Sequence, residues 1–367
     1  MTTVDNDSGL VLSDVEVTEF FGDKPIRWYQ KACREGIIKA LNDGIKRVIV
    51  VLPTGAGKTI TVACSMSDQR VRDILGVKDG ESMRVMFVSH KTRLLTQAEQ
   101  AFADSSNVEI ITQSMFSNIP AELIEKGWHI TILDEGHHES CLSFQLQLEQ
   151  LGEHPVIYIT ATPYRPDGLI IKANRLINPL SREQAVLEGY LAETELHSIV
   201  DTSAKDKTDM MQNVFSEFIE EMGQTMVFVR TKKEVQTISD FITKLGYKSV
   251  ALLTQTDKQI DVILDQFSAG EVQFLINCNK ISEGVDVKGC SDVVLAKQVG
   301  SYTLLNQIVG RAARPDSPCN VWEFVNPLSS KNLDTTVVVG TPKSHRLLFM
   351  RKGQWNKKHF NYTSNVR

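Results

Sequence analysis

Short apolar runs that alternate with helical patterns decide the fold class of this chain. In the first half, Val48–Leu52 is the longest uninterrupted aliphatic run. Strands are expected at 47–52, 84–90, 108–111, 129–134 and 156–160, and helices at 58–71, 92–103 and 139–150. Runs that are apolar on both faces predict buried strands, and buried strands separated by helices form a parallel sheet. We therefore expect a doubly wound α/β domain.

The alternation stops at 163–181, where prolines and a glycine predict a linker, and then returns. Further strands are expected at 225–230, 247–253, 272–277, 292–297 and 320–325, and helices at 206–222, 231–245, 256–268 and 301–312. A chain of 367 residues has the length of two to three domains. The sequence thus predicts two tandem α/β lobes, the first at 24–165 and the second, with the linker, at 166–327.

Both ends of the chain differ in charge from this middle. Residues 1–23 carry six Asp or Glu and no Lys or Arg, whereas residues 343–367 carry seven Lys or Arg and no acid. We expect an acidic N-terminal tail at 1–23 and a basic C-terminal extension at 328–367. Aromatic residues among the cations of the extension favour nucleic-acid binding. A helix packed on the second lobe through Leu347, Leu348 and Phe349 is the alternative.

Composition excludes several classes of protein. No run approaches the roughly 20 apolar residues that a membrane-spanning helix needs. The net charge of −5 excludes a basic coat over the whole surface, so any nucleic-acid site must be local. The six scattered cysteines form no CxxC pair, and the N-terminus has no basic and apolar signal pattern. We expect reduced thiols and a cytoplasmic protein that is not secreted.

A phosphate-binding loop follows the first strand of the first lobe. It reads Leu52-Pro53-Thr54-Gly55-Ala56-Gly57-Lys58-Thr59 and precedes a helix. Glycines let the backbone curl around a phosphate, toward which the N–H groups and the helix N-terminus then point. Lys58 is expected to reach the β- and γ-phosphates, and Thr59 to bind Mg²⁺. Leu52 replaces the usual first glycine, which leaves the residues that contact phosphate in place.

An acidic pair ends another strand, in Leu133-Asp134-Glu135-Gly136-His137-His138. We expect this strand to lie beside the phosphate-loop strand. Asp134 would then hold Mg²⁺, and Glu135 would deprotonate the attacking water. Taken alone, the pair is equally compatible with the start of a surface helix, where acidic side chains interact favourably with the positive end of the helix dipole.

The segment Thr160-Ala161-Thr162-Pro163 ends the next strand. Its two hydroxyl groups could signal to His137 whether the γ-phosphate is present.

A basic helix is predicted late in the second lobe, in Gln307-Ile308-Val309-Gly310-Arg311-Ala312-Ala313-Arg314. Gln307, Arg311 and Arg314 recur at i, i+4 and i+7 and therefore share one face. Two fixed guanidinium groups suit a polyphosphate. A solvated basic stripe is the alternative when this segment is taken alone.

The order PTGAGKT, DEGHH, TATPYR, SEGVDV and QIVGRAAR resembles the superfamily 2 helicases and translocases. The resemblance covers roughly residues 24–327. Within that superfamily the chain is similar to the restriction-motor and DNA-repair branch, including RadD-type and phage UvsW-type helicases. The cues are Ile26-Arg27-Trp28-Tyr29-Gln30, the TATPYR motif and the Val321–Phe324 strand. DEGHH departs from DEAD, DEAH and DECH, although the pattern is of DExH type.

The resemblance implies RecA-like lobes with ATP and Mg²⁺ between them, and a role for each matching residue. Arg27 and Gln30 would read adenine, and Gly284 and Asp286 would contact ribose and the facing lobe. Gln307, Arg311 and Arg314 would act on the γ-phosphate, the arginines as arginine fingers. His137, Thr160 and Thr162 would couple hydrolysis to movement. The nucleic-acid backbone would run along His90, Lys91, Thr92, Arg93, Gln113, Ser114, Arg230 and Thr231.

These features predict an ATP-dependent DNA helicase or translocase, active in replication, recombination or repair. Closure of the lobes on ATP and their parting after hydrolysis would move the protein along a strand. An RNA helicase, the motor subunit of a restriction system, and an ATP-gated clamp or annealing factor are the alternatives. The compact form is compatible with an enzyme of a phage-infected or bacterial cell.

Overall fold

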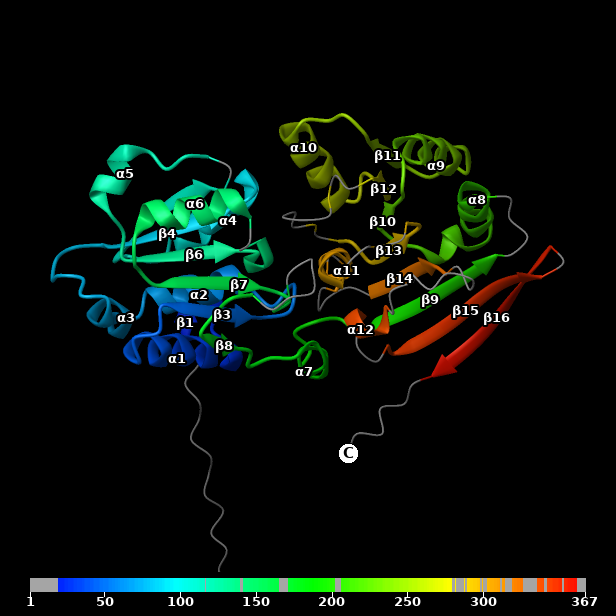
Figure 1. Ribbon diagram of the computed structural model, residues 1–367. Coiled ribbons are helices and arrows are strands. Elements are labelled where there is room, and N and C mark those ends of the chain that lie inside the picture. Colours follow the sequence, from blue (N-terminus) through cyan, green and yellow to red (C-terminus); the bar gives the residue numbers. More distant parts are fainter. Residues whose placement is uncertain are drawn as a thin grey trace, which may run out of the picture.

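The computed structural model consists of two α/β lobes joined by a linker (Figure 1). It describes residues 19–115, 117–138, 141–164, 171–201, 206–278, 281, 287, 289–297, 299, 302–310, 312–313, 319–325, 335–339, 342–351 and 353–361. Each lobe is built on a sheet dominated by parallel strands, with helices packed on its faces. The predicted fold class is therefore confirmed. No helix in the described ranges is long and apolar enough to cross a bilayer.

The first lobe has a six-stranded sheet in which every neighbouring pair is parallel. In spatial order the strands are β5 (Val108–Ser114), β4 (Met83–Ser89), β6 (Ile130–Asp134), β7 (Val156–Thr160), β3 (Arg47–Val51) and β8 (Arg175–Ile177). The helices are α1 (Trp28–Asn42), α2 (Lys58–Met66), α3 (Gln69–Ile74), α4 (Thr92–Phe102), α5 (Ala121–Lys126) and α6 (Leu142–Leu151). A short antiparallel pair, β1 (Phe20–Phe21) and β2 (Lys24–Pro25), precedes α1.

The order of strands corrects one expectation. The strand that ends in Asp134, β6, does not lie beside the phosphate-loop strand β3, because β7 pairs with both of them. The chain leaves β6, crosses through α6 and returns in β7, which fills the position between the two. As a consequence Thr160, the last residue of β7, lies between the acidic turn and the phosphate loop.

One predicted helix is divided. The pattern at 58–71 forms α2 and α3, which are separated at Ser67 and Asp68. The Asp68 carboxylate accepts a hydrogen bond from the Arg70 N–H at 3.0 Å and so caps α3. A side chain that caps a helix start favours a break there over a continuous helix.

The second lobe follows the linker helix α7 (Arg182–Leu187) and has an eight-stranded sheet. In spatial order its strands are β11 (Ser249–Leu252), β12 (Phe274–Asn277), β10 (Thr225–Phe228), β13 (Asp292–Leu295), β14 (Cys319–Phe324), β9 (Thr194–Asp201), β15 (Ser344–Arg351) and β16 (Gln354–Asn361). The helices are α8 (Lys207–Phe218), the short 3₁₀ turn Ile219–Glu221, α9 (Lys232–Lys244), α10 (Asp257–Ser268), α11 (Tyr302–Val309) and α12 (Thr336–Val339).

In the basic extension, the segment with Leu347, Leu348 and Phe349 forms a strand of an antiparallel pair and not the helix of the alternative. Strand β15 pairs in parallel with β9, and β16 pairs with β15 in antiparallel register, so both strands extend the second sheet. Leu348 is fully buried against the core, and Trp355 packs on Phe218. Arg346 and Lys357 both bond to Glu221. The two strands thus stay on the second lobe through packing and charge pairing, and Figure 1 shows them at the far edge of that sheet.

Candidate nucleotide site and nucleic-acid face

The phosphate loop lies between β3 and α2, as the sequence predicts. Gly55 has φ 92° and Gly57 has φ 78°, conformations in which a side chain would be strained. Gly57 is the N-cap of α2, and no side chain caps this helix. The first N–H groups of α2 are therefore open to an anion, and Lys58 and Thr59 open the helix beside them.

The adenine-motif residues pack directly on this loop. The Tyr29 hydroxyl donates to the Ala56 carbonyl at 2.9 Å, and the Gln30 side-chain amide donates to the Thr61 hydroxyl at 3.3 Å. The Arg27 N–H donates to the Gln30 side-chain oxygen at 2.9 Å. Both ends of the Gln30 amide are therefore used within the protein. The Arg27 bond closes the start of α1 itself, whereas the bonds from Tyr29 and Gln30 tie α1 to the phosphate loop and to α2, at the place where the resemblance puts adenine recognition.

Tyr190 joins this group, and the sequence reasoning missed it. The Arg27 guanidinium lies 4.6 Å from the centroid of the Tyr190 ring, which also meets the Tyr29 ring edge-on at 5.3 Å. Tyr190 comes from the linker between the lobes, about 160 residues after Arg27 in the chain. A flat guanidinium on an aromatic face suits the stacking of a purine. No local pattern around Tyr190 marks this role.

The acidic turn carries a strained backbone. Glu135 has φ 51° and is the one non-glycine residue with positive φ among the described residues. Such left-handed conformations cluster at functional sites. Asp134 is 4% exposed and Glu135 is 8% exposed. Burial, and next the charge of Glu135, raise the pKa of Asp134 to about 7, while the charge of Lys58 opposes that rise.

A lack of space at residue 136 accounts for the glycine in DEGHH, where DEAH has an alanine. A Cβ at Gly136 would lie 2.8 Å from the Cβ of Tyr158 on β7. That distance is too short for any alanine at this backbone position. The near atoms are the Cβ and backbone of β7, so the close approach of β7 to the acidic turn excludes a side chain at 136.

The coupling residues are in contact with the acidic turn. The His137 Nδ1 atom lies 3.5 Å from the Glu135 carboxylate and 3.4 Å from the Thr160 hydroxyl. The Thr160 hydroxyl in turn donates to the Thr162 carbonyl at 2.9 Å. His137 is 2% exposed and Thr160 is fully buried. His137, Thr160 and Thr162 form a continuous path from Glu135 to the end of β7, and their coupling of hydrolysis to movement stays a prediction.

A second path from the acidic turn uses histidine rings, and the sequence reasoning did not assign it. The rings of His137 and His138 lie 4.3 Å apart, and those of His138 and His90 lie 4.8 Å apart. His90 follows β4 and directly precedes the start of α4. The acidic turn is thus packed against the segment that is predicted to contact nucleic acid.

The second lobe approaches the phosphate loop at the end of α11. A Cβ at Gly310 would lie 2.5 Å from the Thr54 side chain, and one at Gly55 would lie 3.7 Å from the Ala313 carbonyl. Figure 1 shows α11 on the side of the second lobe that faces the first. Gln307, one turn before Gly310, is 2% exposed, and neither polar atom of its amide has a hydrogen-bond partner. A buried amide without partners is suited to receive a ligand group.

Four predicted site residues lie outside the described residues. These are Gly284, Asp286, Arg311 and Arg314. Their predicted neighbours Gly310, Ala312 and Ala313 are described, so the structure places the surrounding chain next to the phosphate loop.

The first-lobe residues predicted to contact nucleic acid fall into two groups. Lys91 is the N-cap of α4, Thr92 opens that helix, and no side chain caps it. Arg93 pairs across the lobes with Asp261 of α10 at 2.6 Å. Gln113, by contrast, is 5% exposed, and its amide donates to the Ser114 and Ser117 carbonyls at 3.1 and 2.9 Å. Gln113 therefore braces the loop after β5 and is not placed for direct contact.

The second-lobe contact residues are engaged with an acid. The Thr231 hydroxyl accepts from the Glu234 N–H at 3.2 Å and so caps α9. The Glu234 carboxylate accepts from the N–H groups of Arg230 and Thr231 at 2.8 and 3.0 Å. The Arg230 side chain is 70% exposed and lies 3.4 Å from the same carboxylate. Arg230 and Thr231 are both exposed, but each is held by Glu234.

The residues present fit a nucleotide with a divalent cation. The loop offers N–H groups and Lys58 to phosphates, and Thr59 and Asp134 offer the oxygen ligands that Mg²⁺ prefers. A nearby cation would stabilise the ionised form of this buried carboxyl group, whose pKa is raised by burial. Since the loop, the acidic turn and Thr160 all follow carboxyl ends of parallel strands, they lie on one edge of the sheet.

The fold and this site define a two-lobed, RecA-like P-loop protein. Two family models match the chain: Type III restriction enzyme, res subunit, at residues 23–118, and Helicase conserved C-terminal domain, at residues 206–316. The chain belongs to helicase superfamily 2, a class of ATP-dependent enzymes.

Two relatives extend over most of the chain. The ATP-dependent helicase IRC3 of Saccharomyces cerevisiae is 21% identical, with 90% of this chain and 56% of IRC3 covered. A 51.5 kDa protein of a Lactococcus phage is 24% identical, with 71% of this chain and 61% of that protein covered. The chain therefore spans less than two thirds of the length of these relatives.

Solved structures share the two-lobed fold. An HsdR subunit fragment of a type I restriction enzyme from Vibrio vulnificus has a TM-score of 0.69 at 20% identity, covering 90% of this chain and 70% of that one. The type ISP restriction-modification enzyme LlaBIII bound to DNA has a TM-score of 0.65 at 14% identity, covering 90% and 32%. Dbp5 of Saccharomyces cerevisiae bound to RNA and ADP BeF3 has a TM-score of 0.59 at 14% identity, covering 88% and 89%.

Proposed function

We propose that this chain is an ATP-driven motor that translocates along, unwinds or remodels DNA during replication, recombination or repair. The observation that carries the proposal is the contact between the lobes at the phosphate loop. Thr54 of the first lobe meets Gly310 of the second, so a triphosphate held by the loop lies where the lobes join. Binding or loss of a phosphate there changes how the lobes hold together.

Each residue of the candidate site has a separate proposed role in ATP hydrolysis. The loop N–H groups and Lys58 hold the phosphates, and Glu135 takes the proton of the attacking water. Mg²⁺, held by Thr59 and Asp134, would supply positive charge to the phosphate oxygens. Gln307 would orient the γ-phosphate or the water with its amide. Arg311 and Arg314 would stabilise the developing charge, a role that rests on the sequence resemblance.

Movement would follow from two contact paths that leave Glu135. One runs through His137 and Thr160, and the other through the rings of His138 and His90. The second path ends at His90, beside the residues that are predicted to hold nucleic acid, and the first ends at Thr162, after β7. Grip on phosphates through Lys91, Thr92 and Arg93 would be independent of sequence and sensitive to salt.

DNA is favoured over RNA by the restriction-enzyme family model at 23–118 and by the motif resemblance to the restriction-motor branch. RNA remains the second candidate because Dbp5, which shares the fold, is bound to RNA in its structure. A clamp or annealing factor that uses ATP only to open and close is the third candidate. The free cysteines are compatible with a cytoplasmic protein.

One experiment separates these candidates. ATP turnover of the full chain is measured with no nucleic acid, single-stranded DNA, duplex DNA, branched DNA and single-stranded RNA. We expect strong stimulation by one or more DNA forms and little by RNA. Strand-displacement and triplex-displacement assays then distinguish unwinding from translocation, and a clamp would show neither.

The control for contaminating ATPases is Lys58→Ala, which removes the cation that faces the phosphates. Lys78→Ala, an exposed lysine on the same lobe, is the matched substitution. Turnover should be lost in the first variant and kept in the second. Stimulation by RNA that equals or exceeds that by every DNA form would replace the DNA proposal with the RNA one.

A further inference from the structure

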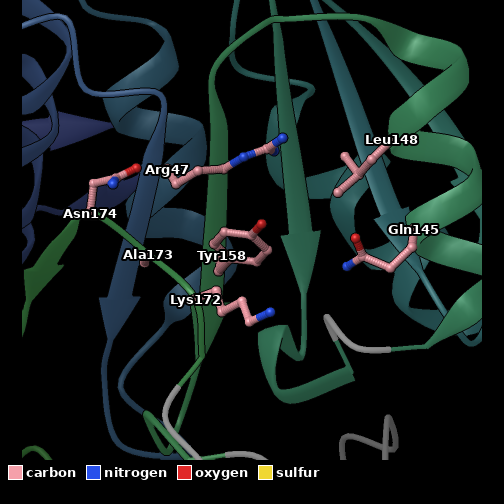
Figure 2. A pocket seen from close by; sticks show the side chains of 7 residues that line it. All are labelled: Arg47, Gln145, Leu148, Tyr158, Lys172, Ala173 and Asn174. Carbon is pink, nitrogen blue, oxygen red and sulfur yellow. The ribbon is translucent and has the colours of Figure 1, made fainter.

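A second pocket lies on the first lobe, away from the nucleotide site. It has a volume of about 510 Å³ and is lined by Arg47, Gln145, Leu148, Tyr158, Lys172, Ala173 and Asn174. Figure 2 shows the Arg47 guanidinium, the Lys172 ammonium and the Gln145 amide arranged around the Tyr158 ring. The walls come from the starts and middles of strands β3 and β7, from α6, and from the segment that precedes β8.

This pocket is separate from the phosphate loop. Arg47 is the first residue of β3, whereas the loop follows the last residue of that strand. At about 3.3 Å per residue, the two ends of β3 are roughly 13 Å apart. None of the residues assigned to ATP, Mg²⁺ or nucleic acid lines the pocket.

The charge of the pocket is one-sided. Arg47 and Lys172 are cationic, and none of the seven lining residues is acidic. One terminal guanidinium nitrogen of Arg47 is buried and has no hydrogen-bond partner. A buried charged donor that lacks an acceptor costs free energy, and an anion in the pocket would remove that cost. Lys172 is exposed at the rim of the pocket, where its ammonium group can form an ion pair with such an anion.

The remaining lining residues define the rest of the ligand. Leu148 and Ala173 are apolar and line the pocket together with Tyr158, so one side of the pocket suits an organic body. A phosphomonoester carries a charge of about −1.5 to −2 near neutral pH and so matches two cations. A monocarboxylate would match only one of them. The volume is that of a ligand pocket for a small molecule.

We propose that this pocket binds a small organic phosphomonoester, with the phosphate between Arg47 and Lys172 and a one-ring body against Tyr158 and Leu148. The site does not depend on the proposed motor function. It is held open by backbone contacts, since the Asn174 N–H donates to the Arg47 carbonyl at 2.8 Å and fixes the segment that carries Lys172.

The choice of test variants follows from the packing of Tyr158. Tyr158 is buried in the first lobe and its Cβ lies against Gly136, so truncation of the ring would leave a cavity beside the acidic turn. Arg47→Gln and Lys172→Gln instead remove one charge each and keep a polar side chain on a shorter stem. Lys78→Gln removes one charge from an exposed position of the same lobe that does not line the pocket.

The experiment is isothermal titration calorimetry of phenyl phosphate into the full chain, with the phosphate loop saturated by a non-hydrolysable ATP analogue and Mg²⁺. We expect one saturable site. Arg47→Gln should weaken binding at least tenfold, Lys172→Gln should weaken it several-fold, and Lys78→Gln should bind as the wild type does. Thermal melting of each variant verifies that it folds, and the exposed Lys172 provides a readout should Arg47→Gln fail to fold.

Two comparison ligands test the parts of the proposal. Benzoate has the ring and a single charge, and inorganic phosphate has the charge and no ring, so both should bind more weakly than phenyl phosphate. No saturable binding of phenyl phosphate by the wild type, or equal binding by Arg47→Gln and Lys172→Gln, would overturn the site. If benzoate binds as tightly as phenyl phosphate, the pocket does not select a phosphate group. If inorganic phosphate binds as tightly as phenyl phosphate, the pocket does not bind the ring.

Discussion

Two helices of the first lobe and two of the second begin in opposite ways. In the first lobe, α2 starts at Gly57 and α4 starts at Lys91, and neither start has a side-chain cap. In the second lobe, α9 starts at Thr231 with a complete capping box, and α10 starts at Thr256 with another. Both lobes have similar parallel sheets, so the difference lies in the residues at the helix starts.

An uncapped start leaves N–H groups and the positive end of the dipole for an anion from outside the protein. A capping box uses those N–H groups internally, and at α9 it also places the Glu234 carboxylate where a phosphate is predicted. The starts of α2 and α4 can therefore offer backbone N–H groups to a phosphate. At α9 and α10 these groups are used internally, so a phosphate at the start of α9 would be held through side chains such as Arg230.

The largest expected effect concerns a glutamate of the first lobe. Glu135→Gln removes the proton acceptor and keeps the side-chain shape, so turnover should fall by about 10²–10⁴. Affinity for a non-hydrolysable ATP analogue should stay close to the wild-type value. Steady-state ATPase and analogue titration measure the two quantities. Glu217→Gln, an exposed glutamate on α8, is the matched control, and unchanged turnover in Glu135→Gln would show that the base is another residue.

The next effect tests the open start of α2. Gly57→Ala places a side chain at φ 78°, with its Cβ 3.3 Å from the Gln30 amide nitrogen. Strain of about 1–2 kcal/mol at this position should distort the loop and lower the affinity for ATP by roughly tenfold. Gly246→Ala has similar strain at φ 95° with no atom within 4 Å of the Cβ. It should lower thermal stability and leave ATP affinity unchanged, and equal ATP affinity in both variants would contradict the role of the loop.

A smaller effect tests the closed start of α9. Glu234→Gln can still accept the capping hydrogen bonds but has no charge. Loss of a carboxylate at a helix N-terminus that faces phosphate should raise nucleic-acid affinity by roughly two- to fivefold at low salt. Fluorescence anisotropy with single-stranded DNA measures it, again with Glu217→Gln as the control. Weaker binding in Glu234→Gln would mean that the rigid cap matters more than the charge.

The smallest expected effect concerns the ion pair between Arg93 of the first lobe and Asp261 of the second. Asp261→Asn frees Arg93 from its partner in the other lobe. The pair is partly exposed, so its contribution is about 1 kcal/mol or less, and DNA affinity should rise by no more than roughly fivefold. The gain should vanish at high salt. Asp265→Asn, one turn along α10, is the control, and a gain that persists when Arg93 is also replaced by Ala would exclude this explanation.

Local patterns were enough to predict much of the candidate site. The strand, glycine loop and helix at 47–66 are contiguous, so their geometry follows from near neighbours. Asp134 to His137 and Thr160 were also found, because polar residues that follow apolar strands must gather at one edge of a parallel sheet. Tyr190 and the ring contact of His90 with His138 were missed, since each depends on a partner far away in the sequence.

The sequence by itself determined the two α/β lobes, the phosphate loop and the acidic turn, because hydrophobic period and glycine placement act over a few residues. Only the tertiary structure decided that β7 separates β6 from β3, that β7 approaches the acidic turn too closely for a side chain at 136, and that 344–351 and 354–361 join the second sheet as two strands. Strand neighbours and side-chain clashes are set by packing between distant segments. That packing selects among arrangements that satisfy the same local pattern equally well.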